Sequence, residues 1–308
     1  MQPTSTRYLV GTGGWAYFKI SKKPSLSAYS QVFNFTEVNY TFYEYPEMVR
    51  VERWRRMVPD DFVFSVRCHQ DLSHKIGFKP IDAAYDVVNQ MLLYCETLKA
   101  PFLVVETPAG QVMNKREVDE AKDFLSSLSL RGIRLVWEIR ASVIPAVVEL
   151  IREFNIVHCV DLSRNKPSVK SDVAYSRLFG KGKLNIYQFT DEELMEIDQK
   201  ASESNSKVVA LSFHGLRMNT DANRFLHYKH TGEFVPVTSF TGIESVKAVL
   251  SEDAQFPTSK TDLVAHQGWK VVDVTSDKRV HLSELLSRVS KTRFSNADEV
   301  ISAVEKVM

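Results

Sequence analysis

The segment RLVWEIR, residues 134 to 140, places two opposite charges in a run that is otherwise typical of a buried strand. Glu138 and Arg140 are two positions apart, so their side chains share one face of such a strand. A carboxylate beside a guanidinium stays ionised, which suits a base or nucleophile, and the guanidinium binds anions. The pair therefore indicates a functional face on this strand.

The same alternation places polar side chains on the matching face of other strand-like runs. These residues are Glu37, Asn39, Thr41, Arg67, His69, Glu106, Asp161, Ser163, Arg177, Ser212 and His214. Each of these sets reaches into the later half of its run, and the opposite parity collects apolar residues. We expect one ring of polar side chains where the strands end.

The elements that would carry this ring alternate regularly along the chain. Eight β-rich runs lie at 8–15, 35–42, 62–70, 102–108, 134–140, 156–163, 173–180 and 207–215. Amphipathic helical patterns lie between them at 81–99, 115–130, 143–155 and 190–204. Eight alternating units predict a (β/α)8 barrel of the TIM type, whose active sites lie at the carboxyl ends of the strands. An ordinary barrel helix is missing from the patterns of 16–34 and 164–172.

The pattern changes at about residue 231. We expect a barrel domain at 1–230 and a small α-rich appendage at 231–308, with Ser295 capping its last helix. Trp269 is expected to be a packing residue, either in the core of that appendage or where the appendage meets the barrel. A chain of 308 residues with 44% hydrophobic residues is long enough to build both parts.

Charge and cysteine content limit the classes of function. The 39 basic and 38 acidic residues give a formal net charge of +1, which argues against a broad cationic coat for nucleic acid. Cys68, Cys95 and Cys159 lack metal-ligand spacing and lie in apolar runs, which predicts reduced thiols and a cytoplasmic location. The chain contains no stretch of about 18 apolar residues, so we expect no membrane span. The oligomeric state stays open.

Five motifs occur together in an order that resembles the YecE-like proteins, domain-of-unknown-function family 72. They are GTGGW (11–15), FTEVNYTFYEYP (35–46), FVFSVR (62–67), VWEIR (136–140) and YSRLFG (175–180). The resemblance covers about residues 8 to 225, and it implies a TIM-type barrel but no particular reaction. Carried over position by position, it marks Gly11, Gly13, Trp15, Glu37, Asn39, Tyr43, Glu138, Arg140 and Arg177.

Four positions depart from the pattern of that family. Arg67 stands where a Lys is usual, Glu106 where a Gln is usual, and Phe179 where a His is usual. His214 lies where the family has an Asn-rich segment. The resemblance therefore implies a mouth that is more acidic at Glu106 than in the rest of the family.

The expected mouth favours an anionic ligand, and phosphate best fits it. Arg67, Arg140 and Arg177 would converge there, and a guanidinium binds phosphate through two parallel hydrogen bonds. The segment GKGK, with Lys181 and Lys183, follows the seventh strand, where TIM barrels often hold phosphate. Aromatic residues are expected at the rim, where they can stack on a base or sugar, with Asn39 as an orienting donor. These aromatic residues are Trp15, Tyr17 and the tyrosines of 40–45, including Tyr43.

The carboxylates supply candidate acids and bases. Glu138 is expected to act as a base, and Glu106, if it lacks a cation, as an acid with a raised pKa. Glu37 and Asp161 complete the candidate catalytic set. In an alternative arrangement a divalent metal is the cofactor, although no HxH or HExxH spacing supports it. Its ligands would be Glu37, Asp161, His69 and His214.

Two classes of function follow from these residues. The first is a hydrolase or lyase that cleaves a phosphoester or N-glycosidic bond in a phosphorylated substrate. The second is a non-catalytic sensor of a phosphorylated ligand, and a two-carboxylate glycosidase is a weaker third choice. The expected partner is a phosphorylated small molecule or a damaged or single-stranded nucleic acid.

Overall fold

The computed structural model describes residues 6–20, 23–183 and 185–308. The chain forms two compact units: Met1–Leu178 with Gln199–Phe213, and Phe179–Asp198 with His214–Met308. The boundary expected at residue 230 stays a prediction. Within the described ranges, helices that combine the length and the apolar character needed to cross a membrane are absent.

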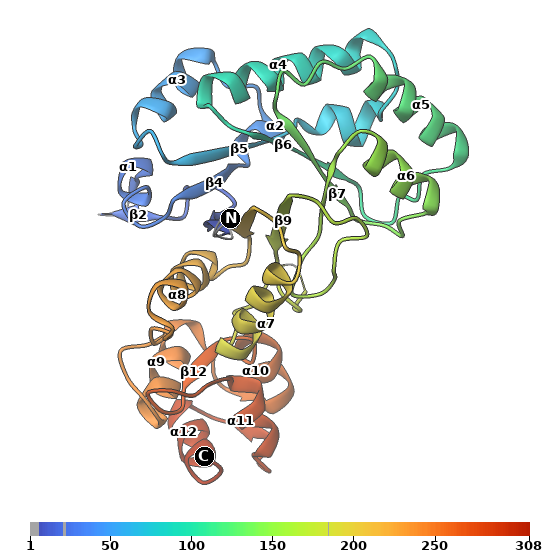
Figure 1. Ribbon diagram of the computed structural model, residues 1–308. Helices are drawn as coiled ribbons and strands as arrows, with labels where there is room; N and C mark the ends of the chain where they lie inside the picture. Colours follow the sequence, from blue (N-terminus) through green and yellow to red (C-terminus); the bar gives the residue numbers. More distant parts are fainter. Residues whose placement is uncertain (1–5, 21–22, 184) are drawn as a thin grey trace. The chain divides into compact units, whose positions relative to one another are not determined.

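The first unit contains a parallel eight-stranded sheet (Figure 1). Its strands are β1 (Arg7–Thr12), β4 (Phe35–Val38), β5 (Val63–Arg67), β6 (Phe102–Thr107), β7 (Arg134–Ile139), β8 (Val157–Cys159), β9 (Val173–Leu178) and β10 (Val208–Phe213). They follow the order β8-β7-β6-β5-β4-β1-β10-β9, and a parallel bridge between Val160 and Ser176 links the two outer strands. Because seven strands lie within predicted runs and β1 begins one residue before its run, the prediction of a TIM-type barrel is confirmed.

Helices of the first unit lie on the outer side of these strands (Figure 1). The helices α4 (Asp82–Leu98), α5 (Lys115–Ser126), α6 (Pro145–Glu153) and α7 (Asp191–Ser202) occupy the four predicted helical stretches, and α7 belongs to the second unit up to Asp198. Their ends follow local signals: Asn114 and Glu117 form a capping box at α5, and Pro145 opens α6. Residues 164–172 form no helix, as expected.

The segments that lack a regular pattern form short elements. A hairpin of β2 (Lys19–Ile20) and β3 (Lys23–Pro24) precedes α1 (Leu26–Tyr29). After β4 the chain forms α2 (Tyr40–Tyr43) and α3 (Met48–Arg56), and after β5 it forms a π-helix, η1 (Asp71–Ile76). Single-turn π-helices are rare and occur often at functional sites.

The lower part of the barrel axis is filled by apolar side chains. They are Leu9, Phe35, Phe102, Val104, Val136, Val157, Cys159, Val173, Tyr175 and Ala210. These residues share the inward parity of their strands with the charged residues that follow them toward the carboxyl ends. The barrel is therefore a packed core and not a pore.

The second unit is rich in helices and has its own apolar core. It contains α8 (Met218–Thr231), α9 (Ile243–Asp253), α10 (Lys260–Gln267), α11 (Leu282–Arg288) and α12 (Ala297–Glu305). Two small antiparallel sheets pair β11 (Thr258–Ser259) with β14 (Arg293–Phe294), and β12 (Val271–Asp273) with β13 (Arg279–His281). The cap of α12 is Asn296, whose side chain accepts from Glu299 N, so the expectation of Ser295 was wrong by one residue.

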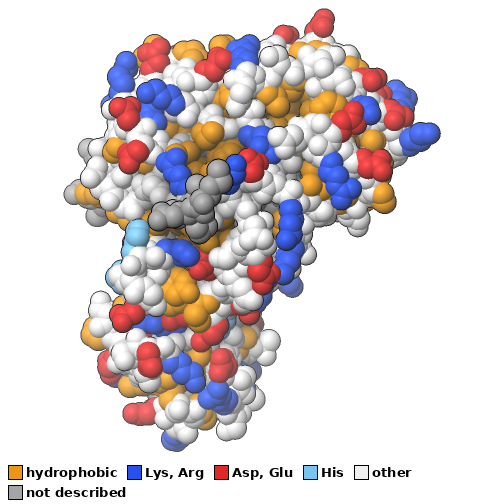
Figure 2. Space-filling view, viewed as in Figure 1, with side chains coloured by type: hydrophobic (Ala, Val, Ile, Leu, Met, Phe, Trp, Pro, Cys, Tyr) orange, Lys and Arg blue, Asp and Glu red, His pale blue; other side chains and the backbone are white. Residues whose placement is uncertain are grey.

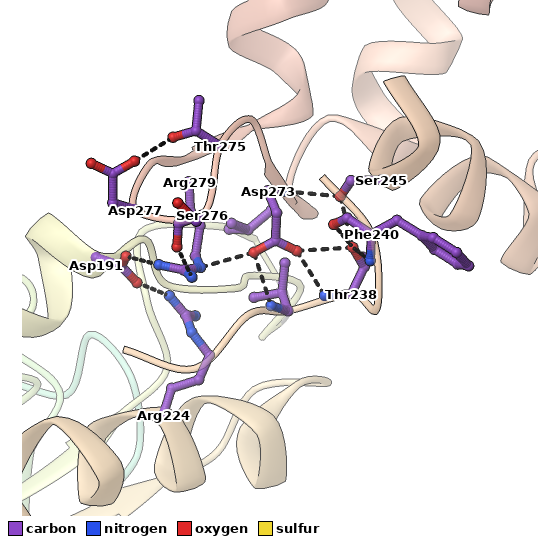
Figure 3. A network of polar contacts seen from close by, with 12 residues as sticks. Asp191, Arg224, Thr238, Phe240, Ser245, Asp273, Thr275, Ser276, Asp277 and Arg279 are labelled. Carbon is purple, nitrogen blue, oxygen red and sulfur yellow. Dashed lines mark hydrogen bonds and ion pairs between the residues drawn. The ribbon is translucent and has the colours of Figure 1, made fainter. Parts of the chain in front are cut away.

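Four buried ionic side chains join separate segments of this second unit (Figure 3). Asp191 accepts from Arg224 Nη2 at 2.5 Å and from Arg279 Nη1 at 2.6 Å, and Arg279 Nε donates to Asp273 at 2.8 Å. Asp273 also accepts from the backbone N–H of Thr238. We call Asp191, Arg224, Asp273 and Arg279 the Asp–Arg network.

Candidate functional site

Three glutamates and three arginines meet where β4, β5, β6, β7 and β9 end. We call them the Glu–Arg cluster: Glu37, Arg67, Glu106, Glu138, Arg140 and Arg177. The Arg177 guanidinium contacts all three carboxylates: its Nε donates to Glu37 Oε1 at 3.1 Å. Its Nη1 donates to Glu106 Oε2 at 2.5 Å and to Glu138 Oε2. The parity inferred from the sequence therefore brings these charges together.

Glu106 is also bound by the other two arginines. Arg67 Nη2 donates to Glu106 Oε2 at 2.5 Å, and Arg140 Nη1 lies 2.8 Å from Glu106 Oε1. Arg140 Nε donates to Glu138 Oε1 at 3.1 Å. The three negative and three positive charges balance, which lowers the cost of burying them.

The expectation that Glu106 lacks a cation was wrong. Burial raises the pKa of Glu106, but the charges of Arg177, Arg67 and Arg140 outweigh burial and hold the pKa below its ordinary value. Burial opposes the charge of Arg177 as well, yet the three glutamates raise its pKa well above the ordinary value. Glu106 is therefore ionised near neutral pH and cannot serve as the general acid.

Exposure distinguishes the members of this cluster. The side chains of Arg177 and Glu37 are 1% and 0% exposed, whereas that of Arg140 is 34% exposed. The hydroxyl of Tyr175 donates to Glu37 Oε2 at 2.9 Å, so both Glu37 oxygens accept hydrogen bonds inside the barrel. The cluster is thus open to solvent at Arg140, whereas Glu37 is enclosed by the barrel core and bound by Tyr175 and Arg177.

Asp161 is engaged with its own loop. Its Oδ1 accepts from the backbone N and the hydroxyl of Ser163 at 2.9 and 2.6 Å, and its Oδ2 lies 3.8 Å from Arg164 Nε. Groups of three or more His, Cys, Asp or Glu side chains suited to a metal ion are absent from the described part of the chain. The alternative metal site is therefore not formed there by its four expected ligands, Glu37, Asp161, His69 and His214.

The two expected site histidines have different surroundings. His69 is buried, stacks on Tyr45 with ring centroids 4.0 Å apart, and accepts from the backbone N of Asp71. His214 directly follows β10 and belongs to the second unit, where its ring lies 4.9 Å from that of Phe179. Both rings thus make packing contacts with aromatic neighbours.

The GKGK segment is packed against its own unit. A Cβ atom at Gly180 would lie 2.2 Å from the Tyr187 ring, so this glycine permits a close approach. Lys181 Nζ lies 3.0 Å from Glu193 Oε1, and this hydrogen bond raises the pKa of the lysine. The cation expected to bind phosphate is already paired with a carboxylate.

A hollow of about 800 Å³ lies at the carboxyl ends of β1 and β4. It is lined by Gly13, Gly14, Trp15, Ala16, Tyr17, Leu26, Val38, Asn39, Tyr40, Tyr43, Arg50, Arg53, Trp54 and Met57. Asn39 connects it to the Glu–Arg cluster: its Nδ2 donates to Gly13 O at 2.8 Å, and its Oδ1 accepts from Arg67 Nη1 at 3.3 Å. We call this feature the aromatic hollow.

Local sequence explains the shape of the aromatic hollow. A Cβ atom at Gly11 would lie 1.8 Å from Phe35 O, so only glycine lets β1 approach β4 at this point. Gly14 has a φ of +94°, which turns the chain immediately before Trp15. The Trp15 ring then meets Trp54 of α3 edge to face, with centroids 5.3 Å apart.

The aromatic hollow offers exposed rings and a guanidinium. Tyr43 is 61% exposed, and Arg50 Nη1 donates to the Tyr40 hydroxyl at 2.9 Å. The side chain of Arg53 is exposed, and its guanidinium makes no hydrogen bond or ion pair with the residues that the structure describes. Its five N–H donors are available to a ligand.

Sequence analysis identified Trp15, Asn39 and Tyr43 but missed the wall that α3 contributes. The signal was present: Arg50, Arg53 and Trp54 are three and four positions apart and so share one helix face. It also missed His74 on η1, whose ring packs on Phe42 at 5.3 Å. Nothing in the strand pattern pointed to a π-helix after β5.

The fold and the polar strand ends define a TIM-type barrel protein. A family model described as protein of unknown function DUF72 matches residues 9–230, and the chain belongs to this family. The resemblance inferred from the motifs is thereby confirmed. A second model, described as a family of unknown function (DUF5789), matches residues 243–308.

Solved structures of the same family share the fold. A DUF72 family protein of Thermotoga maritima MSB8 is 20% identical with a TM-score of 0.60, covering 73% of this chain and 99% of that one. A DUF72 family protein of Enterococcus faecalis V583 is 15% identical with a TM-score of 0.57, covering 74% and 99%. No curated protein matches the chain.

Proposed function

We propose that this DUF72 barrel binds a phosphorylated ligand with a planar ring, namely a nucleotide or an unpaired nucleotide of single-stranded or damaged nucleic acid. One observation carries the proposal: the aromatic hollow combines exposed rings with the guanidinium of Arg53. Its volume of about 800 Å³ falls within the ordinary size of small-molecule sites, roughly 300 to 1,000 Å³.

The chemistry of the lining favours a nucleotide over a neutral sugar. Stacking of a base on an aromatic side chain contributes about 1–3 kcal/mol, and a free guanidinium binds phosphate through two hydrogen bonds. Carboxylates are absent among the described residues that line this hollow, and the buried glutamates nearby are held by arginines. A two-carboxylate glycosidase is therefore the weakest of the three expected functions.

The charge distribution favours a local contact over a broad one. Acidic and basic side chains are interspersed on the face seen in Figure 2, in line with the net charge of +1. A protein that neutralises few phosphates binds duplex weakly, whereas flexible or damaged strands expose a base at lower cost. The buried free thiols support a cytoplasmic location within this proposal.

A second candidate function is hydrolysis or elimination at the strand ends. Arg140 is one-third exposed beside Glu138, and active sites of TIM barrels lie at this end of the sheet. Arg140 would hold a phosphate next to the carboxyl group of Glu138. Without such turnover, the protein would be a sensor of its phosphorylated ligand.

Two arginines of α3 provide a matched test. Arg53 lines the aromatic hollow, whereas Arg56 is exposed, pairs with Glu52 at 3.7 Å and is not part of the lining. Fluorescence anisotropy of a labelled, 5′-phosphorylated single-stranded oligonucleotide measures binding. We expect Arg53→Gln to weaken binding by about 10-fold or more, the loss of a charged hydrogen bond, and Arg56→Gln to change it little. Equal effects of both variants, or no binding by the wild type, would contradict the proposal.

A further inference from the structure

His74 is an exposed imidazole on the π-helix η1 that the binding proposal does not use. Its ring meets the edge of Phe42 at 5.3 Å, and the face of Phe42 carries the Arg67 guanidinium at 3.7 Å. Its Nδ1 is 2.9 Å from the hydroxyl of Ser73, the preceding residue. The ring is therefore held at the edge of the Glu–Arg cluster.

The pKa of His74 reflects this position. Burial lowers it from 6.5, Glu106 raises it, and Arg67 and Arg140 lower it further. The imidazole is therefore mostly neutral at pH 7, the state that accepts a proton. The charges of Arg67, Glu106 and Arg140, at the ends of β5, β6 and β7, therefore act on His74, which contacts the cluster through Phe42.

In one tautomer of His74, the hydrogen bond to Ser73 leaves Nε2 as the proton acceptor. When Nδ1–H donates to the Ser73 hydroxyl, the lone pair is on Nε2, for which the described residues supply no partner. A second hollow of about 180 Å³ is lined in part by Ser73, His74, Phe78 and Thr107. It has room for several water molecules, since one occupies about 30 Å³.

We propose that His74 is a catalytic residue, the proton acceptor in hydrolysis of a phosphoester whose phosphate is held by Arg140. This inference rests on the second candidate function, hydrolysis at the strand ends. Water attacks phosphorus, a P–O bond forms, and Nε2 takes the proton that the water loses. The P–O bond to the leaving oxygen breaks, and its electron pair stays on that oxygen, which takes a proton from solvent. The imidazolium returns its proton to solvent.

Other charged groups face the imidazole and contribute to its titration. On η1 itself Asp71 and Lys75 form an ion pair at 2.6 Å. The smaller hollow adds Lys79, Glu117 and Glu120, and the cluster adds Arg67, Glu106 and Arg140. A fall of the hydrolysis rate at low pH is therefore attributed to His74 only if that fall disappears when His74 is replaced.

Steady-state kinetics with bis(p-nitrophenyl) phosphate and p-nitrophenyl phosphate test the inference in the full-length protein. We expect His74→Gln to lower kcat by about 10²- to 10⁴-fold, as for loss of a general base, with KM little changed. The wild-type rate should rise with pH through a midpoint below 6.5, and the variant should lose this limb. His230→Gln, at an exposed position of α8, is the matched control and should behave as wild type.

Each outcome supports or overturns the inference. Absence of turnover by the wild type, or an unchanged kcat in both His74→Gln and His74→Asn, would overturn it. Because His74 is exposed, both variants are expected to fold, and circular dichroism checks this. If the oligonucleotide binds but no ester is cleaved, binding by the aromatic hollow stands and the role of His74 falls. If esters are cleaved in a His74-dependent way without oligonucleotide binding, the reverse holds.

Discussion

Each unit of the molecule buries a set of opposite charges, and the two sets differ in how they meet solvent. In the Asp–Arg network of the second unit, no side chain is more than 8% exposed. In the Glu–Arg cluster of the barrel, Arg140 is 34% exposed, and Asn39 connects Arg67 to the aromatic hollow. The two sets therefore differ in access, because the Glu–Arg cluster has a member at the surface and the Asp–Arg network is buried throughout.

The sequence positions of the two sets explain this difference. The Glu–Arg cluster occupies one ring at the ends of barrel strands, where loops rather than a continuous core cover it. The Asp–Arg network joins α7, α8, β12 and β13, segments far apart in the chain, and Asp273 also holds the backbone N–H of Thr238 (Figure 3). We interpret the network as a structural link and the cluster as the base of a site.

The largest effect is expected from removing the central guanidinium of the cluster. Arg177→Met removes the guanidinium that contacts all three glutamates of the cluster, so we expect a loss of about 3–5 kcal/mol in the free energy of unfolding. Urea denaturation measures this loss. Arg140→Met, at the exposed side, should cost much less, and equal losses would contradict the distinction between centre and rim.

The second unit should lose stability as pH rises. Burial raises the pKa of Asp221 from 3.8 to about 7, against the opposing charge of Arg224. Between pH 3.8 and about 7, Asp221 holds a proton in the folded state that it releases in the unfolded state. The loss of unfolding free energy caused by ionising Asp221 is therefore absent below pH 3.8 and complete above about 7. It corresponds to about 4 kcal/mol. Hydrogen exchange of peptides from the second unit should show this slope in the wild type and a flatter one in Asp221→Asn.

The stability of the barrel should change with pH in the opposite direction and by a somewhat smaller amount. Burial lowers the pKa of His158 from 6.5 to about 4, and its Nδ1 accepts from Ser168 N at 2.9 Å. The unfolded state therefore binds a proton that the folded state does not, and stability falls by about 3 kcal/mol as pH falls from 6.5 to 4. His158→Gln should remove this slope from barrel peptides. If the stability of both units changed with pH in the same direction, Asp221 and His158 would not be the groups that dominate this pH dependence.

The barrel could be predicted because its signals are local. Alternation with a period of two placed the residues of β7 and identified Glu138 as inward-facing before any partner was known. The ionic partners of these side chains could not be predicted, because they depend on the register of the strands and on how far each side chain extends. Glu106 lies opposite Glu138 in the sheet, yet both are bound by Arg177 from β9. The acid role expected of Glu106 was lost for this reason.

The aromatic hollow and the second unit were only partly predictable for a different reason. Trp54 reaches the site because α3 packs beside the loop after β1, and this tertiary contact cannot be seen in the local sequence. Strands such as β11 and β14 have two residues each, too few to show an alternating pattern. Local sequence patterns were therefore enough to predict the helices and strands, whereas predicting the site would have required knowledge of how they pack.

Tryptophan fluorescence tests the central claim, binding in the aromatic hollow, most directly. Trp15 and Trp54 line this hollow, Trp137 is buried in the barrel unit, and Trp269 belongs to the second unit. Titration with a 5′-phosphorylated single-stranded oligonucleotide should quench the wild type and Trp269→Phe alike. The double variant Trp15→Phe, Trp54→Phe should lose most of the quenching while anisotropy still reports binding, because phenylalanine preserves stacking. Quenching that persists in the double variant and disappears in Trp269→Phe would place the ligand elsewhere and contradict the account.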